Sequence, residues 1–169
     1  MPEKFTDRAN KVMAFAEEEV RRLGHEYVGT EHILLGFCSQ AREEGSVEGR
    51  IFERLGVNCA QVVSDVEKLA RPVQDRTRFS AIPIPKTPRA RGVLDCAVEY
   101  MEERGDNVID THHLFYGLLR QQDGLSGQIL MNLGLKLEEY YPVIAEIFPS
   151  EKEHPLEGES FWKIPREMY

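Results

Sequence analysis

The sequence predicts an all-α protein built from two copies of one four-helix unit. Two observations predict this fold: an internal repeat, and apolar residues at helical spacing within each copy. A shift of 81 residues aligns positions 6–36 with 87–117, and ten of these 31 positions are identical. The identical pairs are Thr6/Thr87, Arg8/Arg89, Ala9/Ala90, Val12/Val93, Ala16/Ala97, Glu18/Glu99, Gly24/Gly105, Thr30/Thr111, His32/His113 and Gly36/Gly117.

The repeat continues beyond this block at a shift of 78 residues. There Gly49, Ile51, Leu55 and Gly56 align with Gly127, Ile129, Leu133 and Gly134. We therefore expect two four-helix repeats in one compact domain over residues 1–149. Repeat one covers 3–70, a linker covers 71–86, repeat two covers 87–149, and a C-terminal tail covers 150–169. Two such units can bury a core that neither fills well alone.

The first helix of each copy has clear start and stop signals. Thr6 and Thr87 are predicted N-caps, because a threonine hydroxyl accepts a hydrogen bond from a backbone N–H that the helix leaves without a partner. Pro88 suits the first helical position, where its missing N–H costs nothing. Gly24 and Gly105 are expected to end these helices in the left-handed conformation.

The later helices follow similar signals. Thr30 and Thr111 are predicted to cap the second helices, and the third helices end at Leu55-Gly56 and Leu133-Gly134. The fourth helices are expected over 59–69, with Asn58 as N-cap, and over 137–148.

Two segments lack a helical period. The linker (RPVQDRTRFSAIPIPK) is expected to be extended, with Ile82 and Ile84 pinning it to the surface. The tail contains an apolar cluster, Phe161, Trp162, Ile164, Met168 and Tyr169. This cluster is predicted to pack on its own domain, and the alternative is a peptide that docks on a partner.

Composition narrows the function classes. The net charge of −8 disfavours nucleic-acid binding, which needs clustered Lys and Arg. No apolar run is long enough to span a membrane, and the N-terminus lacks the apolar core of a secretory signal, so a cytoplasmic location is expected. Cys38, Cys59 and Cys96 are isolated, odd in number, and predicted to be small buried hydrophobes rather than disulfide partners.

Histidines offer the only alternative catalytic chemistry. His112 and His113 adjoin Asp110, so a metal-dependent hydrolase is one hypothesis. However, neighbouring side chains point about 100° apart on a helix, so both are not expected to bind one metal ion. We favour a structural role in which His32 and His113 hydrogen-bond the neighbouring loop, and we expect neither metal nor cofactor.

The repeated motif resembles a known family. Phe5-Thr6-Asp7-Arg8-Ala9, Gly24-His25 and the run from Val28 to Gly36 (VGTEHILLG) are similar to the Clp N-terminal (Clp repeat) domain, most of all the ClpC type. The run from Thr111 to Gly117 (THHLFYG) resembles the second repeat of that family. The resemblance covers roughly residues 3–149 and implies two pseudo-twofold-related four-helix repeats in one domain, in agreement with the repeat pattern above. In Clp unfoldases ATPase modules follow this domain, but this sequence contains no GxxxxGK[ST] phosphate-binding loop.

The resemblance also implies a binding site. ClpC-type N-domains dock adaptors and recognise phosphorylated arginine on proteins marked for degradation. It implies one pocket made of Thr6 and Glu31, with Tyr27, Val28 and Gly29 in the preceding loop. The second pocket would contain Thr87 and His112, and a neutral histidine cannot pair with guanidinium as a carboxylate does. Alternatively, Thr6 and Thr87 are only helix caps, and Glu31 only favours the helix dipole.

The sequence therefore predicts a non-catalytic module that docks substrates or adaptors of a Clp-type unfoldase. It does not decide whether the module delivers substrates or competes for them. The alternatives are the hydrolase above and a regulatory protein that docks through its Trp162-containing tail. The sequence leaves the oligomeric state open.

Overall fold

The computed structural model describes residues 4–70 and 84–149, and these residues form eight α-helices. Repeat one contains α1 (Asp7–Leu23), α2 (Thr30–Ala41), α3 (Val47–Leu55) and α4 (Cys59–Leu69). Repeat two contains α5 (Pro88–Arg104), α6 (Thr111–Arg120), α7 (Leu125–Asn132) and α8 (Leu137–Ile147). Within these residues the only extended pairing is two isolated β-bridges, so the all-α prediction is confirmed.

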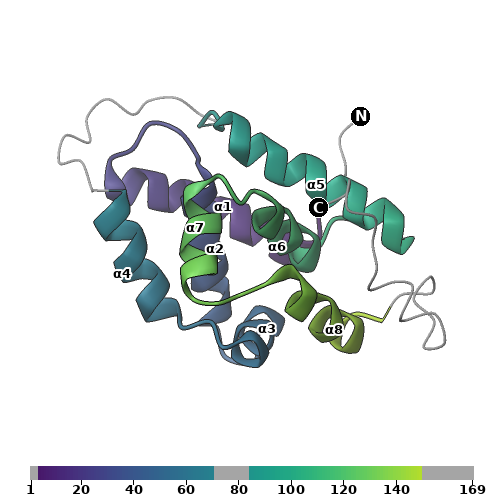
Figure 1. Cartoon of the computed structure of the whole chain (residues 1–169). Coiled ribbons are helices and arrows are strands. Elements are labelled where there is room, and N and C mark those ends of the chain that lie inside the picture. The colour runs from purple at the N-terminus through teal and green to yellow at the C-terminus, as the bar shows by residue number, and fades with distance from the viewer. Residues whose placement is uncertain (1–3, 71–83, 150–169) are drawn as a thin grey trace.

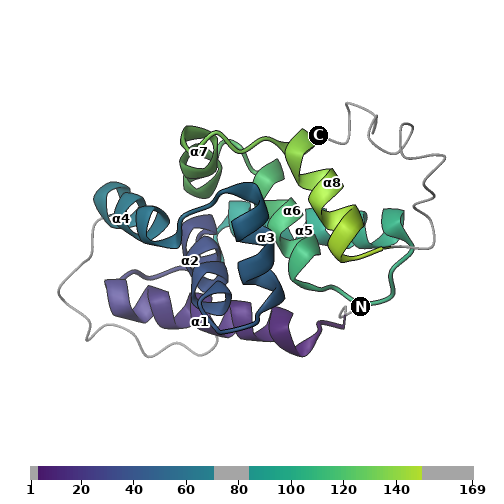
Figure 2. The same cartoon turned by 90° about the horizontal axis from the view of Figure 1, so that it is seen from below.

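The helices of the two repeats pack together into one body (Figure 1). In each repeat the first two helices pack on each other, α1 on α2 and α5 on α6. Across the repeats, α3 lies beside α8 and α4 beside α7 (Figure 2). Exchanging the repeats turns each of these contacts into the other. The predicted doubled scaffold is therefore present, with the third and fourth helices packed against the opposite repeat.

Several predicted helix ends are confirmed. The Thr6 and Thr87 hydroxyls accept from the Ala9 and Ala90 N–H groups, at 3.2 and 3.1 Å. Asn58 caps α4 by accepting from the Gln61 N–H at 3.0 Å. The helix-ending glycines Gly24 and Gly105 have φ angles of 73° and 80°, a left-handed conformation that costs glycine little.

The predicted caps of the second helices are wrong. Gly29 and Asp110 hold the N-cap positions, and Thr30 and Thr111 are the first helical residues. The Thr30 hydroxyl instead accepts from the Ser126 N–H at the start of α7, at 3.3 Å. Asp is a stronger N-cap than Thr, so the residue before Thr111 takes that position.

Two repeat-equivalent glycines allow the helices to cross closely. A Cβ on Gly36 would lie 2.4 Å from the Val12 carbonyl oxygen, and one on Gly117 would lie 2.3 Å from that of Val93. Any side chain there would push α2 away from α1, or α6 away from α5. This close approach explains why the repeat keeps glycine at both positions.

The core is shared between the repeats. Phe115 of α6 lies 5.3 Å, centroid to centroid, from both Phe37 and Phe52 of repeat one. It also lies 5.4 Å from Tyr140 of α8. All four rings are buried, so repeat two inserts an aromatic side chain into the centre of repeat one. Neither repeat encloses this cluster without the other.

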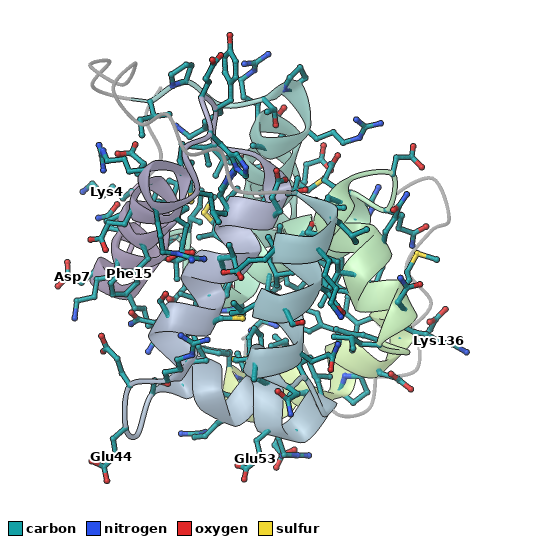
Figure 3. The ribbon with its side chains drawn as sticks, turned by 90° about the vertical axis from the view of Figure 1, so that its left-hand side faces the viewer. Lys4, Asp7, Phe15, Glu44, Glu53 and Lys136 are labelled. Atoms are coloured by element: carbon teal, nitrogen blue, oxygen red, sulfur yellow. The ribbon has the colours of Figure 1, made fainter. Side chains whose placement is uncertain are left out.

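The surface is charged, and side chains such as Asp7, Glu44, Glu53 and Lys136 extend away from the ribbon (Figure 3). None of the described helices combines the length and apolar character that crossing a bilayer requires. Cys38 is buried as predicted, whereas Cys59 and Cys96 are only half-buried.

Some predictions fall outside the described residues. Ile84 is buried, as predicted for its anchoring role, but Ile82 and most of the linker lie outside the described ranges. The tail with Trp162 also lies outside them, so both its predicted packing and its alternative docking role stay predictions.

Candidate functional site

The N-terminal segment of each first helix pairs with a loop of the other repeat. The Thr6 N–H donates to the Ile109 carbonyl at 2.9 Å, and the Ile109 N–H donates to the Lys4 carbonyl at 2.8 Å. The equivalent bonds run from the Val28 N–H to the Pro85 carbonyl, 2.8 Å, and from the Thr87 N–H to the Val28 carbonyl, 2.9 Å. The start of α1 thus faces the loop before α6, and the start of α5 faces the loop before α2.

This exchange corrects the predicted pockets. Thr6 and Glu31 lie near opposite ends of α1, whose 17 residues span about 25 Å at 1.5 Å per residue. Glu31 instead lines a cleft together with Thr87. Thr6 lies beside the loop before α6, where its hydroxyl donates to Asp110, two residues before His112. The pairings of Thr6 with Glu31 and of Thr87 with His112 are therefore wrong. Each site combines residues from both repeats.

The first site, which we call the Thr87 cleft, has a volume of about 240 Å³. It is lined by Gly29, Thr30, Glu31, Thr87, Arg89 and Asp123, among others. The Glu31 side chain is 19% exposed, and Arg89 is exposed. Within residues 4–70 and 84–149, neither Glu31 nor Arg89 makes an ion pair with an oppositely charged Lys, Arg, Asp or Glu side chain. The cleft therefore offers both a carboxylate and a guanidinium to a ligand.

Gly29 determines where the Glu31 carboxylate lies. A Cβ on Gly29 would lie 2.6 Å from Glu31 Oε1, so the carboxylate rests directly over the glycine. Of the other predicted loop residues, Tyr27 is 52% exposed and Val28 is fully buried. Tyr27 can thus contact a partner with its side chain, whereas Val28 contributes only its backbone.

The second site, which we call the Thr6 site, is built around the Asp110 carboxylate. Asp110 accepts from the Thr6 hydroxyl at 2.8 Å and from the Thr111 N–H at 2.7 Å. Arg8 adds two bonds, from Nε at 2.7 Å and from a terminal nitrogen at 2.6 Å. Burial opposes the charged form, but these hydrogen bonds outweigh it and lower the pKa of Asp110 to about 2. The guanidinium and the carboxylate of this site are already paired.

His112 packs in the Thr6 site as an aromatic ring. It is 4% exposed, stacks on Phe148 at 3.9 Å, and neither ring nitrogen has a hydrogen-bond partner among the described residues. Burial lowers the pKa of His112 to about 3, so the ring is neutral near pH 7. Arg8 lies over the same Phe148 ring, 5.1 Å from its centroid. A hollow of about 720 Å³ opens beside these side chains.

His32 and His113 have the structural role that the sequence predicts. The Nδ1 atom of each ring accepts from a backbone N–H at 2.8 Å, that of Gly29 for His32 and that of Asp110 for His113. In a neutral imidazole the proton is then on Nε2. This Nε2–H donates to Nδ1 of His25 at 2.8 Å in repeat one, and to Asp106 Oδ2 at 2.7 Å in repeat two.

This tautomer bears on the metal hypothesis. Asp106, His112 and His113 bring three potential ligand atoms within 4.8 Å of one another, although helical geometry predicts diverging histidines. The Nε2 atom of His113 carries a proton, however, and the Arg104 Nε–H donates to the same Asp106 oxygen at 3.0 Å. A metal ion would need both groups to give up these bonds. The cluster therefore does not fit a metal site.

Comparison with known proteins identifies the family. The family model described as Clp repeat (R) N-terminal domain matches residues 4–133 and 86–155. This chain belongs to that family. The chain is 40% identical over 137 residues to a Guillardia theta protein named ATP-dependent Clp protease ATP-binding subunit ClpA homolog. The match covers 81% of the chain but 16% of that protein.

Other Clp relatives agree. Chloroplastic chaperone protein ClpC1 of Arabidopsis thaliana is 40% identical over 134 residues, which cover 79% of this chain and 14% of that protein. The chain thus spans about one sixth or less of these relatives. Because ClpC1 is a chloroplastic protein, our expectation of a cytoplasmic location stays a prediction.

Solved structures show the same fold. The N-terminal domain of ClpD from Arabidopsis thaliana has a TM-score of 0.65 at 24% identity, covering 85% of this chain and 94% of that one. The Hsp104 N-terminal domain from Candida albicans has a TM-score of 0.70 at 19% identity, with 88% and 94% covered. At these identities the likeness concerns the fold alone.

Sequence reasoning places Gly29 in a binding pocket but misses that it positions the Glu31 carboxylate, and it misses the part of Asp110 in the Thr6 site. Gly29 and Asp110 are repeat-equivalent and adjoin the helices that carry Glu31 and His112. An Asp before Thr-His-His is a strong N-cap signal that could have indicated where the carboxylate lies. The contact of Asp110 with Arg8, 102 residues away, has no local signal.

Proposed function

We propose that this Clp repeat domain is a non-catalytic docking module for substrates or adaptors of a Clp-type unfoldase. Membership of the family supports the proposal, because its relatives carry this domain within much longer Clp chaperones. The observation that carries it is the Thr87 cleft, where neither Glu31 nor Arg89 forms an ion pair with a Lys, Arg, Asp or Glu side chain of the described residues. The opposite charges of Glu31 and Arg89 suit recognition of a charged protein segment, and the exposed Tyr27 lies two residues before Gly29 in the loop that leads into the cleft.

The ligand that this cleft fits best is a phosphorylated arginine side chain. Its phosphoryl group matches the N-terminus of α5, where Thr87 and Arg89 lie, since helix N-termini favour anions. Its guanidinium group matches the Glu31 carboxylate. As a docking module, the domain either delivers marked proteins to an unfoldase or competes with the unfoldase for them.

Calorimetry with a phosphoarginine peptide tests this function. We expect binding to the unmodified protein, and an Ala or Gln replacement of Glu31 to weaken it by about 1.5–3 kcal/mol, the contribution of a charged hydrogen bond. His112→Gln is the matched control, because it changes the repeat-equivalent residue and should leave binding unchanged. Absence of binding to the unmodified protein would reject phosphoarginine as the ligand.

A direct assay separates delivery from competition. Degradation of a phosphoarginine-marked protein by a Clp unfoldase and its protease is followed with increasing amounts of this chain. Acceleration indicates delivery, and slowing indicates competition. If a Glu31→Gln variant has the same effect as the unmodified protein, the effect does not depend on the Thr87 cleft.

A further inference from the structure

The two sites have the same framework but different charges. Thr6 and Arg8 in one site are identical to Thr87 and Arg89 in the other. The loop positions differ, because Asp110 replaces Gly29 and His112 replaces Glu31. At these repeat-equivalent positions each site has one carboxylate and one guanidinium, and a further carboxylate lies nearby: Glu48, 4.0 Å from Arg8, in the Thr6 site, and Asp123 in the lining of the Thr87 cleft. In the Thr6 site the carboxylate belongs to Asp110, the N-cap residue of α6. In the Thr87 cleft it belongs to Glu31, two residues after the N-cap residue of α2.

The two sites differ in whether the carboxylate and the guanidinium pair with each other. In the Thr6 site both oxygens of Asp110 accept from Arg8, at 2.7 and 2.6 Å, and the carboxylate is largely buried. The Arg8 guanidinium is further held over the Phe148 ring. In the Thr87 cleft Arg89 is exposed, and the Glu31 carboxylate rests over Gly29.

A ligand guanidinium gains little in the Thr6 site. To reach Asp110 it must displace Arg8, which exchanges one two-bond guanidinium–carboxylate pair for another. His112, at the position equivalent to Glu31, cannot replace Asp110 as the acceptor for a guanidinium, because it is neutral and its ring is covered by Phe148. In the Thr6 site the Arg8 guanidinium therefore already occupies the carboxylate that the guanidinium group of the ligand would need.

We propose that the Arg8–Asp110 pair closes the Thr6 site, so that each chain binds one phosphoguanidino group, in the Thr87 cleft. This inference rests on the proposed function and specifies its stoichiometry. It makes the domain monovalent although its scaffold is duplicated. A client protein with several modified arginines would then gain no avidity from a single chain.

Titration calorimetry with free phosphoarginine measures the number of sites. We expect one site per chain in the unmodified protein, and the same site with weakened affinity in Glu31→Gln. Two sites per chain, or one site whose affinity is unchanged in Glu31→Gln, would overturn the inference. No binding of either the free ligand or the peptide would instead contradict the proposed function. L-arginine and phosphoserine, each with one half of the ligand, serve as control ligands.

A graft tests the closing pair itself. The double variant Asp110→Gly with His112→Glu gives the Thr6 site the loop residues of the Thr87 cleft and removes the two-bond partner of Arg8, leaving only Glu48, whose Oε2 lies 4.0 Å from Arg8 Nε. We expect two sites per chain in this variant, once circular dichroism has shown that it is folded. A folded graft that still binds one ligand would show that Arg8–Asp110 is not what closes the site. If the graft does not fold, the stoichiometry of the unmodified protein and the affinity of Glu31→Gln decide.

Discussion

The two repeats hold the same backbone in place with different side-chain partners. In repeat one His32 bonds the Gly29 N–H and then His25, and in repeat two His113 bonds the Asp110 N–H and then Asp106. The histidine that braces the loop is kept in both copies, whereas the group behind it has changed from an imidazole to a carboxylate. The scaffold is thus duplicated, but its electrostatics has diverged. The Thr6 site and the Thr87 cleft differ in the same way.

The largest expected effect tests whether the two repeats share one core. Phe115 and its repeat equivalent Leu34 are fully buried. We expect Phe115→Ala to lower the free energy of unfolding by about 4 kcal/mol and Leu34→Ala by about 3 kcal/mol. Urea unfolding followed by circular dichroism measures both. Because Phe115 packs against rings of repeat one, each variant should unfold in a single transition. Two separate transitions would contradict a shared core.

Structural features that depend on residues within one helix could be predicted from the sequence. The caps at Thr6, Asn58 and Thr87, and the helix-ending Gly24 and Gly105, depend on residues a few positions apart. The pairing of Gly36 with Gly117 was visible as a repeat identity, although its cause, the close crossing of α2 over α1, was not. These elements were enough to establish the fold.

The site could be predicted only in its residue types. Thr6, Glu31 and Thr87 were each identified, but an internal repeat has the same sequence pattern whether its segments pair within a copy or between copies. The choice is made by tertiary contacts such as that of Phe5 with Ile109, 104 residues apart. No local period carries that information, and so the residues were assigned to the wrong partners.

A smaller effect concerns pH. Burial lowers the pKa of His32 and of His112 from 6.5 to about 3, and it also lowers the pKa of His113. The unfolded chain therefore binds more protons than the folded one below pH 6.5, and the stability falls as the pH falls. From pH 6.5 to 5 each of the two most shifted groups should cost about 2 kcal/mol. Carboxylates such as Asp110 contribute loss only below about pH 4.

His112→Phe tests which repeat contributes this pH dependence. His112 has no hydrogen-bond partner among the described residues and stacks on Phe148, so phenylalanine should pack in its place. We expect the variant to equal the unmodified protein within about 1 kcal/mol at pH 7. At pH 5 it should be more stable by about 2 kcal/mol, since one neutral buried histidine has been removed. Urea unfolding at both pH values measures this. An unchanged pH dependence would mean that His112 accepts a proton in the folded state without penalty.

The smallest expected effects on stability come from removing the two threonine caps. Thr87→Ala removes one cap hydrogen bond and should cost about 1 kcal/mol. Thr6→Ala should cost about 2 kcal/mol, because the Thr6 hydroxyl also donates to the Asp110 carboxylate at 2.8 Å. Serine at either position keeps the hydroxyl and serves as the control. The binding effects should be reversed: Thr87→Ala weakens binding of phosphoarginine in calorimetry, and Thr6→Ala leaves it unchanged. Equal costs in stability would mean that Thr6 does not support the Arg8–Asp110 pair. Equal losses of binding would mean that the two sites still act alike, despite the different charges around them.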